Sequence, residues 1–213
     1  GCTSLRDPSV YGNNLSSLDL TGCTEMIQLS AQSNELTTLD LSTNDSLVTL
    51  TLENNDLTSI DVTDKPNLTY LRAYNNALTS IDISNNTLLT YLHLDNTDLT
   101  SLDVSNNTLL TNLYLNNNDL TTMDVSSNDS LTHLSLESNS LASITGLSNN
   151  TSLVYLRLKN NELTSLDLSG CTSLRDPSVY GNNLSSLDLT GCTEMIQLSA
   201  QSNELTTLDL STN

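Results

Sequence analysis

The sequence predicts a solenoid, a chain wound into stacked coils with a parallel β-sheet along one face. Three observations predict it. The pattern of residues 68–88 recurs from one end of the 213-residue chain to the other, so that Leu47, Leu68 and Leu89 hold equivalent places. Within each copy, apolar and polar residues alternate as they do in a half-buried strand. An Asn follows that stretch at the same place in nearly every copy. A unit this short cannot bury its apolar side alone, so neighbouring copies must stack.

Each repeat begins at a leucine-type residue, and its places are counted from there. Successive starts are evenly spaced, except that the step ending at Leu153 is longer than the others by a single position. We expect Gly146 to absorb this insertion in a bulge on the back of the solenoid. These starts predict a single continuous solenoid of about ten coils over residues 1–213. The first places are Leu5, Met26, Leu47, Leu68, Leu89, Leu110, Leu131, Leu153 and Leu174.

The two halves of each repeat have different patterns. The first half reads LxxLxL, which predicts a strand with apolar residues facing the core. The Asn at the ninth place ends this strand, and we expect stacked Asn side chains to bond the backbone of neighbouring coils. Thr97 interrupts that ladder once. The return half reads LTSLDLS with small variations, so we expect irregular, 3₁₀ or short β segments there and no full helices.

This pattern resembles the leucine-rich repeat family, and most closely its short bacterial-type repeats of about 21 residues. The resemblance covers the whole chain. It implies a horseshoe-like or gently twisted solenoid with the parallel β-sheet on the concave face, where members of the family commonly bind ligands. Pro8 and Pro177 depart from the pattern because they occupy a core leucine place. A proline removes a strand hydrogen bond, so we expect both coils to be locally irregular.

Two segments of the chain, 1–44 and 170–213, are identical, so that Gly1 corresponds to Gly170. No polar cap of the kind that closes a solenoid is visible at either end. We therefore expect a capless solenoid that is a slice of a longer polymer, whose large repeating unit is the segment 1–169. Deliberate joining of two copies is the alternative.

The charge of the chain excludes several partners. It carries 25 acidic and 6 basic residues, for a net charge of −19. That balance repels nucleic acid and anionic membrane surfaces. No apolar run approaches the roughly 18 residues that a membrane span needs, so we expect no membrane insertion.

The aromatic residues point to one surface. All seven tyrosines, both histidines and half of the basic residues fall on the third, fifth and seventh places, which face out of the predicted sheet. Exposed Tyr beside Arg is typical of a recognition surface. The alternative is that Tyr is simply a good exposed strand residue that stacks on its neighbours. The predicted ligand-binding residues are Tyr70, Arg72, Tyr74, Tyr91, His93, Tyr114, His133, Tyr155 and Arg157.

The repeat also predicts how these residues line up. With strands about 4.8 Å apart, third-place residues stack in one column and fifth-place residues in the next. The first column is Tyr70, Tyr91, Asn112, His133 and Tyr155. The second is Arg72, His93, Tyr114, Ser135 and Arg157.

Three further ladders have simple explanations. An Asp ladder at the fifteenth place, which includes Asp61 and Asp103, is expected to be solvated and to accept local hydrogen bonds. The alternative is Ca²⁺ shared between coils, but neither the EF-hand pattern nor the Gly-rich Ca²⁺-binding nonapeptide is present. A Thr ladder at the twelfth place, which includes Thr79, resembles that of ice-binding proteins or else bonds the local backbone. The pairs Cys2–Cys23 and Cys171–Cys192 stack on adjacent coils within disulfide reach, but parallel side chains fit the disulfide dihedral poorly, so we expect reduced, semi-buried thiols.

From the sequence we expect a non-enzymatic structural or adhesive segment of a long repetitive fibre, extracellular or on a cell surface. Its partners would be copies of itself end to end. One alternative is a recognition module that binds a protein or glycan through the Tyr-rich face. A second alternative is an ice-binding solenoid. No catalytic motif, cofactor or metal site is predicted.

Overall fold

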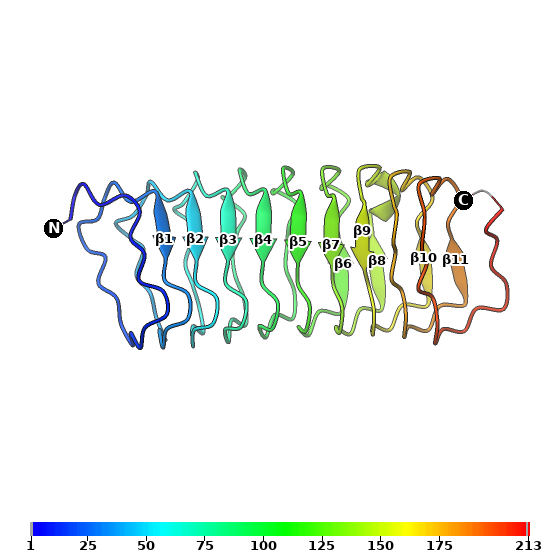
Figure 1. The fold of residues 1–213 in the computed structure, drawn as a ribbon, viewed down its shortest axis with the longest axis horizontal. Coiled ribbons are helices and arrows are strands. Elements are labelled where there is room, and N and C mark those ends of the chain that lie inside the picture. The colour runs from blue at the N-terminus through cyan, green and yellow to red at the C-terminus, as the bar shows by residue number, and fades with distance from the viewer. Residues whose placement is uncertain (1, 212) are drawn as a thin grey trace.

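The computed structural model describes residues 2–211 and 213. It is an elongated stack of coils, each of which crosses a front sheet and returns along the back (Figure 1). The predicted solenoid with a parallel sheet is confirmed. In the described part of the chain the one helical segment is a single 3₁₀ turn, η1 (Leu147–Asn149), so the expectation of no full helices also holds.

The front sheet contains seven strands of three residues each, in the order β1-β2-β3-β4-β5-β7-β9. Every neighbouring pair is parallel and is offset by one coil, so that Tyr70 lies opposite Tyr91 and Arg72 opposite His93. Residues in the middle of each strand face the core, and those on either side face out. The strands are β1 (Gln28–Ser30), β2 (Thr49–Thr51), β3 (Tyr70–Arg72), β4 (Tyr91–His93), β5 (Asn112–Tyr114), β7 (His133–Ser135) and β9 (Tyr155–Arg157).

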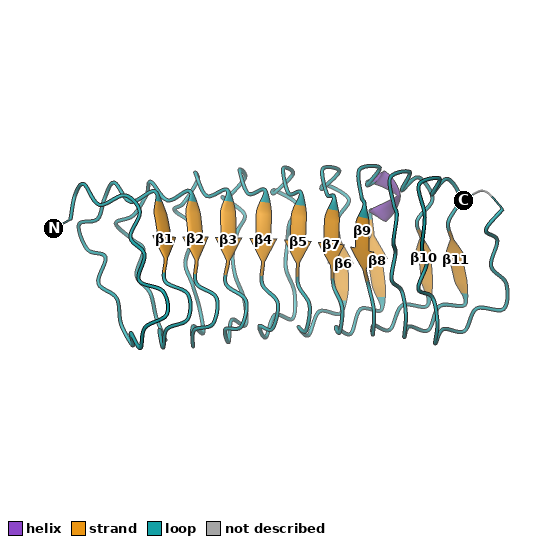
Figure 2. Ribbon diagram, in the orientation of Figure 1, coloured by secondary structure: helices purple, strands orange, loops and turns teal. Residues whose placement is uncertain are grey.

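The back of the solenoid is less regular (Figure 2). Two short parallel pairs form there, β6 with β8 and β10 with β11, and the other return segments are extended without a sheet ladder. This matches the expected mixture of short β, 3₁₀ and irregular segments. The back strands are β6 (Thr122–Asp124), β8 (Ser143–Thr145), β10 (Ser165–Asp167) and β11 (Ser186–Asp188).

One continuous apolar core runs along the axis between front and back. Leu68, Leu71 and Leu78, from three places of one repeat, are completely buried. Full burial of a leucine side chain contributes about 1.5–3 kcal/mol. Because the same places recur, each coil adds an identical layer to the core.

The ninth-place Asn side chains join each coil to the one before it. Asn55 Nδ2 donates to the carbonyls of Leu52 (2.9 Å) and Ala31 (3.0 Å), and its Oδ1 accepts from the Leu36 amide (3.1 Å). The predicted Asn ladder is therefore present. Thr97 breaks it as expected, because its hydroxyl, with a single proton to donate, lies within hydrogen-bond distance of Asn118 Oδ1 (2.6 Å) and Leu94 O (3.1 Å).

The eighth place has a feature that the sequence reasoning missed. Its residue has a positive φ in every coil, between 50° and 68°. Only Gly, Ser and Asn occur there, and Gly and Asn are the residues that most readily adopt this conformation. That restriction was the available signal. The residues are Gly12, Ser33, Asn54, Asn75, Asn96, Asn117, Ser138, Asn160, Gly181 and Ser202.

The irregular coils lie where the sequence places them, with one correction. In the coils of Pro8 and Pro177 the front strand shrinks to single bridges, at Ser9 and Ser178. In the coil with the insertion we expected a bulge at Gly146, but Gly146 (φ 84°) instead begins the 3₁₀ turn η1. A side chain there would bring its Cβ within 2.3 Å of the Ser126 backbone, so this turn requires glycine.

Candidate recognition site on the front sheet

The front sheet brings the predicted site residues together in the two columns expected. Tyr91 pairs with Asn112, Asn112 with His133, and His133 with Tyr155. The neighbouring column runs from Arg72 to Arg157 in the same register. The nine predicted residues separate into two groups. Asn112 separates Tyr91 from His133 in the first column, and Ser135 separates Tyr114 from Arg157 in the second.

Five rings form one continuous group, which we call the aromatic cluster: Tyr70, Tyr74, Tyr91, His93 and Tyr114. Tyr70 and Tyr91 are stacked with centroids 4.4 Å apart and planes 14° apart. His93 lies between Tyr74 (4.4 Å) and Tyr114 (5.0 Å), and Tyr91 also contacts Tyr114 (5.6 Å). Each such pair adds about 0.5–1.5 kcal/mol beyond area burial. The cluster spans β3, β4 and β5.

Burial within this cluster changes the chemistry of its central ring. Desolvation raises the pKa of Tyr91 to about 12, and the adjacent Tyr70 and Tyr114 add to the effect. The Tyr91 hydroxyl is therefore a neutral hydrogen-bonding group throughout the physiological range.

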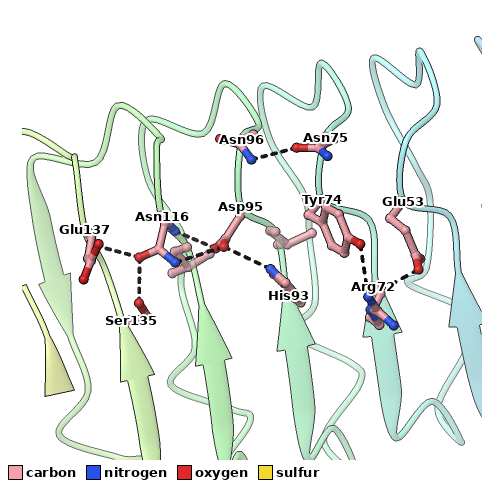
Figure 3. Close-up of polar contacts among 12 residues, drawn as sticks. Glu53, Arg72, Tyr74, Asn75, His93, Asp95, Asn96, Asn116, Ser135 and Glu137 are labelled. Carbon is pink, nitrogen blue, oxygen red and sulfur yellow. Dashed lines mark hydrogen bonds and ion pairs between the residues drawn. The ribbon is translucent and has the colours of Figure 1, made fainter. Parts of the chain in front are cut away.

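A buried carboxylate holds Arg72 beside the cluster (Figure 3). Glu53 Oε1 lies 3.4 Å from Arg72 Nη2, and Glu53 is only 5% exposed. The same Nη2 donates to Tyr74 Oη (3.2 Å), and the guanidinium carbon lies 5.2 Å from the Tyr74 ring centroid. Burial lowers the pKa of Arg72, but Glu53 and the nearby tyrosines outweigh burial and raise it overall. Arg72 is thus a fixed, permanently charged residue.

A second polar network crosses three strands next to the cluster (Figure 3). Asp95 Oδ1 accepts from the Asn116 amide (2.7 Å) and its Oδ2 accepts from Asn116 Nδ2 (2.9 Å). His93 Nε2 also lies 3.0 Å from Asp95 Oδ2, although the angle is not that of a hydrogen bond. Asn116 Oδ1 in turn accepts from Ser135 Oγ and from the Glu137 amide, both at 2.7 Å. These contacts fix the Asp95 carboxylate at the edge of the cluster.

Sequence reasoning missed the four polar partners Glu53, Asp95, Asn116 and Glu137. All four occupy the seventh place, which the pattern already predicted to face outward. The available signal was therefore a column of mixed charge beside the tyrosine columns.

The second group lies farther along the sheet. His133 and Tyr155 are stacked at 4.6 Å, and desolvation lowers the pKa of His133. Arg157 pairs with Asp176 (2.6 Å) and lies 5.9 Å from the Tyr155 ring. Tyr155 is 43% exposed, more than any ring of the aromatic cluster. The structure thus brings His133, Tyr155 and Arg157 together, but apart from the other six residues.

Comparisons with known proteins find similar solved structures that share one fold. No family model matches the chain, and no curated protein matches it. Among solved structures, a leucine-rich repeat protein of Leptospira interrogans is 26% identical with a TM-score of 0.86, and the match covers 97% of this chain and 57% of that one. The functional domain of InlJ from Listeria monocytogenes, which includes a cysteine ladder, is 33% identical with a TM-score of 0.64 over 94% of this chain and 55% of that one. YopM from Yersinia enterocolitica is 25% identical with a TM-score of 0.74, and the match covers 88% of this chain and 40% of that one.

The protein is a leucine-rich repeat solenoid. The length of its repeats matches that of its structural neighbours. The chain spans little more than half the length of the first two structures above, at 57% and 55%.

The back of this leucine-rich repeat solenoid carries the Asp ladder, which has a local role. Each of these Asp residues accepts a hydrogen bond from the amide two residues later, as Asp61 Oδ1 does from Thr63 (3.0 Å). Hydrogen bonds from Ser105 lower the pKa of Asp103 in the same way. Within the described residues, no group of three or more His, Cys, Asp or Glu is placed to hold a metal ion.

The other two back ladders differ in burial. The Thr ladder is exposed at both Thr79 and Thr100. Cys23, Cys171 and Cys192 are buried free thiols, whereas Cys2 is exposed rather than semi-buried as expected. Burial raises the pKa of Cys171 to about 12, so this thiol is protonated and unreactive.

The nineteenth place shows why cysteine fits there. Asn107 Nδ2 donates to Ile83 O, 24 residues earlier, and to Asn86 O, 21 residues earlier. Cys171 Sγ makes the first of these two contacts, to Leu147 O (3.2 Å). Among the described residues the Asn107 Oδ1 atom has no hydrogen-bond partner. A cysteine at this place therefore loses the contact to the carbonyl 21 residues earlier. In return, it has no side-chain oxygen that would be buried without a hydrogen-bond partner.

Finally, no helix in the described residues is long and apolar enough to cross a membrane.

Proposed function

We propose that the protein is a non-enzymatic recognition module that binds a partner protein through the aromatic cluster of its front sheet. One observation carries the proposal. Five rings from three adjacent strands form a continuous, partly exposed group, held in place by stacking and by the Glu53–Arg72 and Asp95–Asn116 contacts. Rigid aromatic side chains beside Arg are the residues that dominate binding energy at protein interfaces. The leucine-rich repeat neighbours support a protein-interaction role in general terms.

The ring geometry favours a protein over a glycan. Sugars are usually bound against the open face of an aromatic ring. Tyr70 and Tyr91 cover each other's faces at 4.4 Å, and His93 is covered by Tyr74 and Tyr114. A ligand approaching from solvent therefore meets ring edges and hydroxyl groups. Such a surface suits the mixed polar and apolar groups of a polypeptide.

The test is a selection from a random peptide display library, followed by affinity measurement on the whole chain. For peptides that bind the parent protein, the double variant Tyr91→Ala/Tyr114→Ala is expected to weaken affinity by about 30-fold or more, since truncating a central aromatic anchor costs about 2 kcal/mol or more. The matched control is Thr79→Ala/Thr100→Ala on the exposed Thr ladder, which should bind like the parent. Circular dichroism and thermal unfolding establish that both variants fold.

The proposal fails if the folded tyrosine variant binds every selected peptide as tightly as the parent. It also fails if the threonine control loses affinity to the same degree.

The identical segments 1–44 and 170–213 support a second proposal, the fibre expected from the sequence. We propose that the segment 1–169 is the repeating unit of a longer assembly and that copies align end to end. Sedimentation and negative-stain microscopy over a range of concentrations test it. Elongated multimers are expected, and a strictly monomeric particle at high concentration would contradict it. An extracellular or cell-surface location and the ice-binding alternative remain predictions.

A further inference from the structure

The charges on the front sheet are unequally satisfied. Arg72 is paired with Glu53, and Arg157 is paired with Asp176. The carboxylate of Glu137 has no ion-pair or hydrogen-bond partner among the described residues, although its backbone amide is bonded to Asn116. The arginines of the face are thus neutralised from within, and Lys159, one coil beyond Glu137, lies 5.8 Å from the Tyr180 ring centroid. The Glu137 carboxylate is free to interact with a partner.

Asp95 lies two coils before Glu137 in the same column, with Asn116 between them. Two strand spacings place the two carboxylates about 10 Å apart. The Asp95 side chain is 18% exposed, and two contacts from Asn116 hold it in one orientation. A carboxylate that is already ordered loses little conformational entropy on binding.

The aromatic cluster adjoins Asp95, whose Oδ2 lies 3.0 Å from His93 Nε2, and Glu137 follows β7, the strand next to β5. Beside a carboxylate, aromatic rings suit Lys and Arg side chains, whose alkyl stems pack on the apolar rings while the charged group meets the carboxylate oxygens. The protein contains an internal example of this chemistry. Arg72 lies 5.2 Å from the Tyr74 ring centroid and 3.4 Å from Glu53.

The net charge of −19 also favours a cationic partner, and it does so at longer range. It attracts cationic partners and slows the approach of anionic ones. We propose that the partner is a basic protein segment that places two Lys or Arg side chains, about 10 Å apart, against Asp95 and Glu137 with their stems on the aromatic cluster. This inference rests on the proposed recognition function and specifies the partner's chemistry.

The experiment uses the peptides selected from the random display library with the whole chain at about 0.1 M salt, where the Debye length is about 10 Å. Selected sequences are expected to be enriched in Lys and Arg relative to the input library. Glu137→Gln is expected to weaken their binding about tenfold, and Asp95→Asn by at least as much. Glu137→Gln is the cleaner variant, because Asp95→Asn also disturbs Asn116.

Matched controls remove the same charge elsewhere. Glu204→Gln alters an exposed glutamate near the far end of the solenoid, and Asp103→Asn alters the back ladder while keeping an acceptor for the Ser105 amide. Both controls should retain parental affinity within about twofold. This difference separates a local site from the general attraction of an acidic protein for cations.

The outcomes distinguish the two proposals. Peptides that depend on Tyr91 and Tyr114 but are not enriched in basic residues would overturn the basic partner and leave recognition standing. Equal losses in Glu137→Gln and Glu204→Gln would also overturn it, because binding would then follow net charge alone. Peptides that bind independently of the tyrosines would overturn both.

Discussion

The front sheet and the internal ladders of this solenoid are built from the same repeat but follow different rules. At the third place the residue changes at nearly every coil, through Gln28, Thr49, Tyr70, Asn112 and His133. At the ninth place it is Asn in every coil from Asn34 onward except at Thr97.

The contacts explain this difference. A ninth-place Asn bonds backbone groups that have no other route to a partner, so the fold dictates it. An outward side chain on the front sheet touches only its neighbours on the same surface, so the fold tolerates many residues there. A surface that the fold leaves free, and on which the chain concentrates its rings, is available for recognition.

The strongest test of this difference compares two Asn→Ala changes in the same coil, one in the ninth-place ladder and one on the front sheet. Asn118→Ala leaves the buried Leu99 amide without its acceptor and removes contacts to Leu94 and Leu115. We expect a loss of about 2–4 kcal/mol in the free energy of unfolding. Asn112→Ala on the front sheet removes contacts to Thr111 and Tyr114 and should cost about 1 kcal/mol or less. Urea denaturation measures both, and equal losses would contradict the distinction.

Restoring Asn at position 97 of the ninth-place ladder should raise the free energy of unfolding, by less than Asn118→Ala lowers it. Thr97 offers no acceptor to the Leu78 amide, which has no hydrogen-bond partner among the described residues. In Thr97→Asn, the amide oxygen can accept from Leu78 and Nδ2 can donate to Ala73 O, as Asn55 does in its own coil. We expect stabilisation of about 1 kcal/mol. Destabilisation on urea denaturation would show that Thr97 is preferred for a reason outside the ladder.

The two buried Asn ladders differ from each other, and cysteine substitution sharpens that difference. Asn107→Cys keeps the contact that Cys171 makes and removes an unpaired oxygen, so its effect on the free energy of unfolding should stay within about 1 kcal/mol. Asn118→Cys removes the one acceptor that the Leu99 amide has among the described residues and should cost more. Thermal unfolding under reducing conditions compares them. A larger loss at position 107 than at position 118 would contradict this account.

The smallest effect concerns the protonation of Tyr91. Its folded pKa, about 12, lies above the ordinary value of 10.0, so folding favours the neutral phenol. The resulting stabilisation is present below pH 10 and is lost as the pH rises towards 12. Ultraviolet titration should show a late-ionising tyrosine that Tyr91→Phe removes. Titration of all seven tyrosines near their ordinary pKa, with no late phase, would contradict the packing of the aromatic cluster.

Much of this structure could be predicted from the sequence, because the repeat carries its own geometry. A short, constant period with leucines at fixed places predicts the coil, and alternation with period two predicts which residues face outward. Those two facts were enough to place Tyr91 beside Asn112 and Tyr70 beside Tyr91.

Contacts that depend on side-chain rotamers could not be predicted in this way. The burial of Glu53 beside Arg72 and the two contacts between Asn116 and Asp95 depend on how neighbouring side chains orient on the sheet. The pairing of return segments into β6–β8 and β10–β11 was also beyond the pattern, since all return halves read alike. The positive φ of the eighth place could have been found from its restriction to Gly, Ser and Asn.

Chemical-shift mapping on the isotopically labelled chain tests the central claim most directly. A peptide selected for binding is added, and the amide signals that move are located on the solenoid. We expect the shifted signals to fall on β3, β4, β5 and β7 and on the adjoining seventh-place residues Tyr74, Asp95, Asn116 and Glu137. Shifts centred on the Asp ladder or the Thr ladder of the back would contradict it.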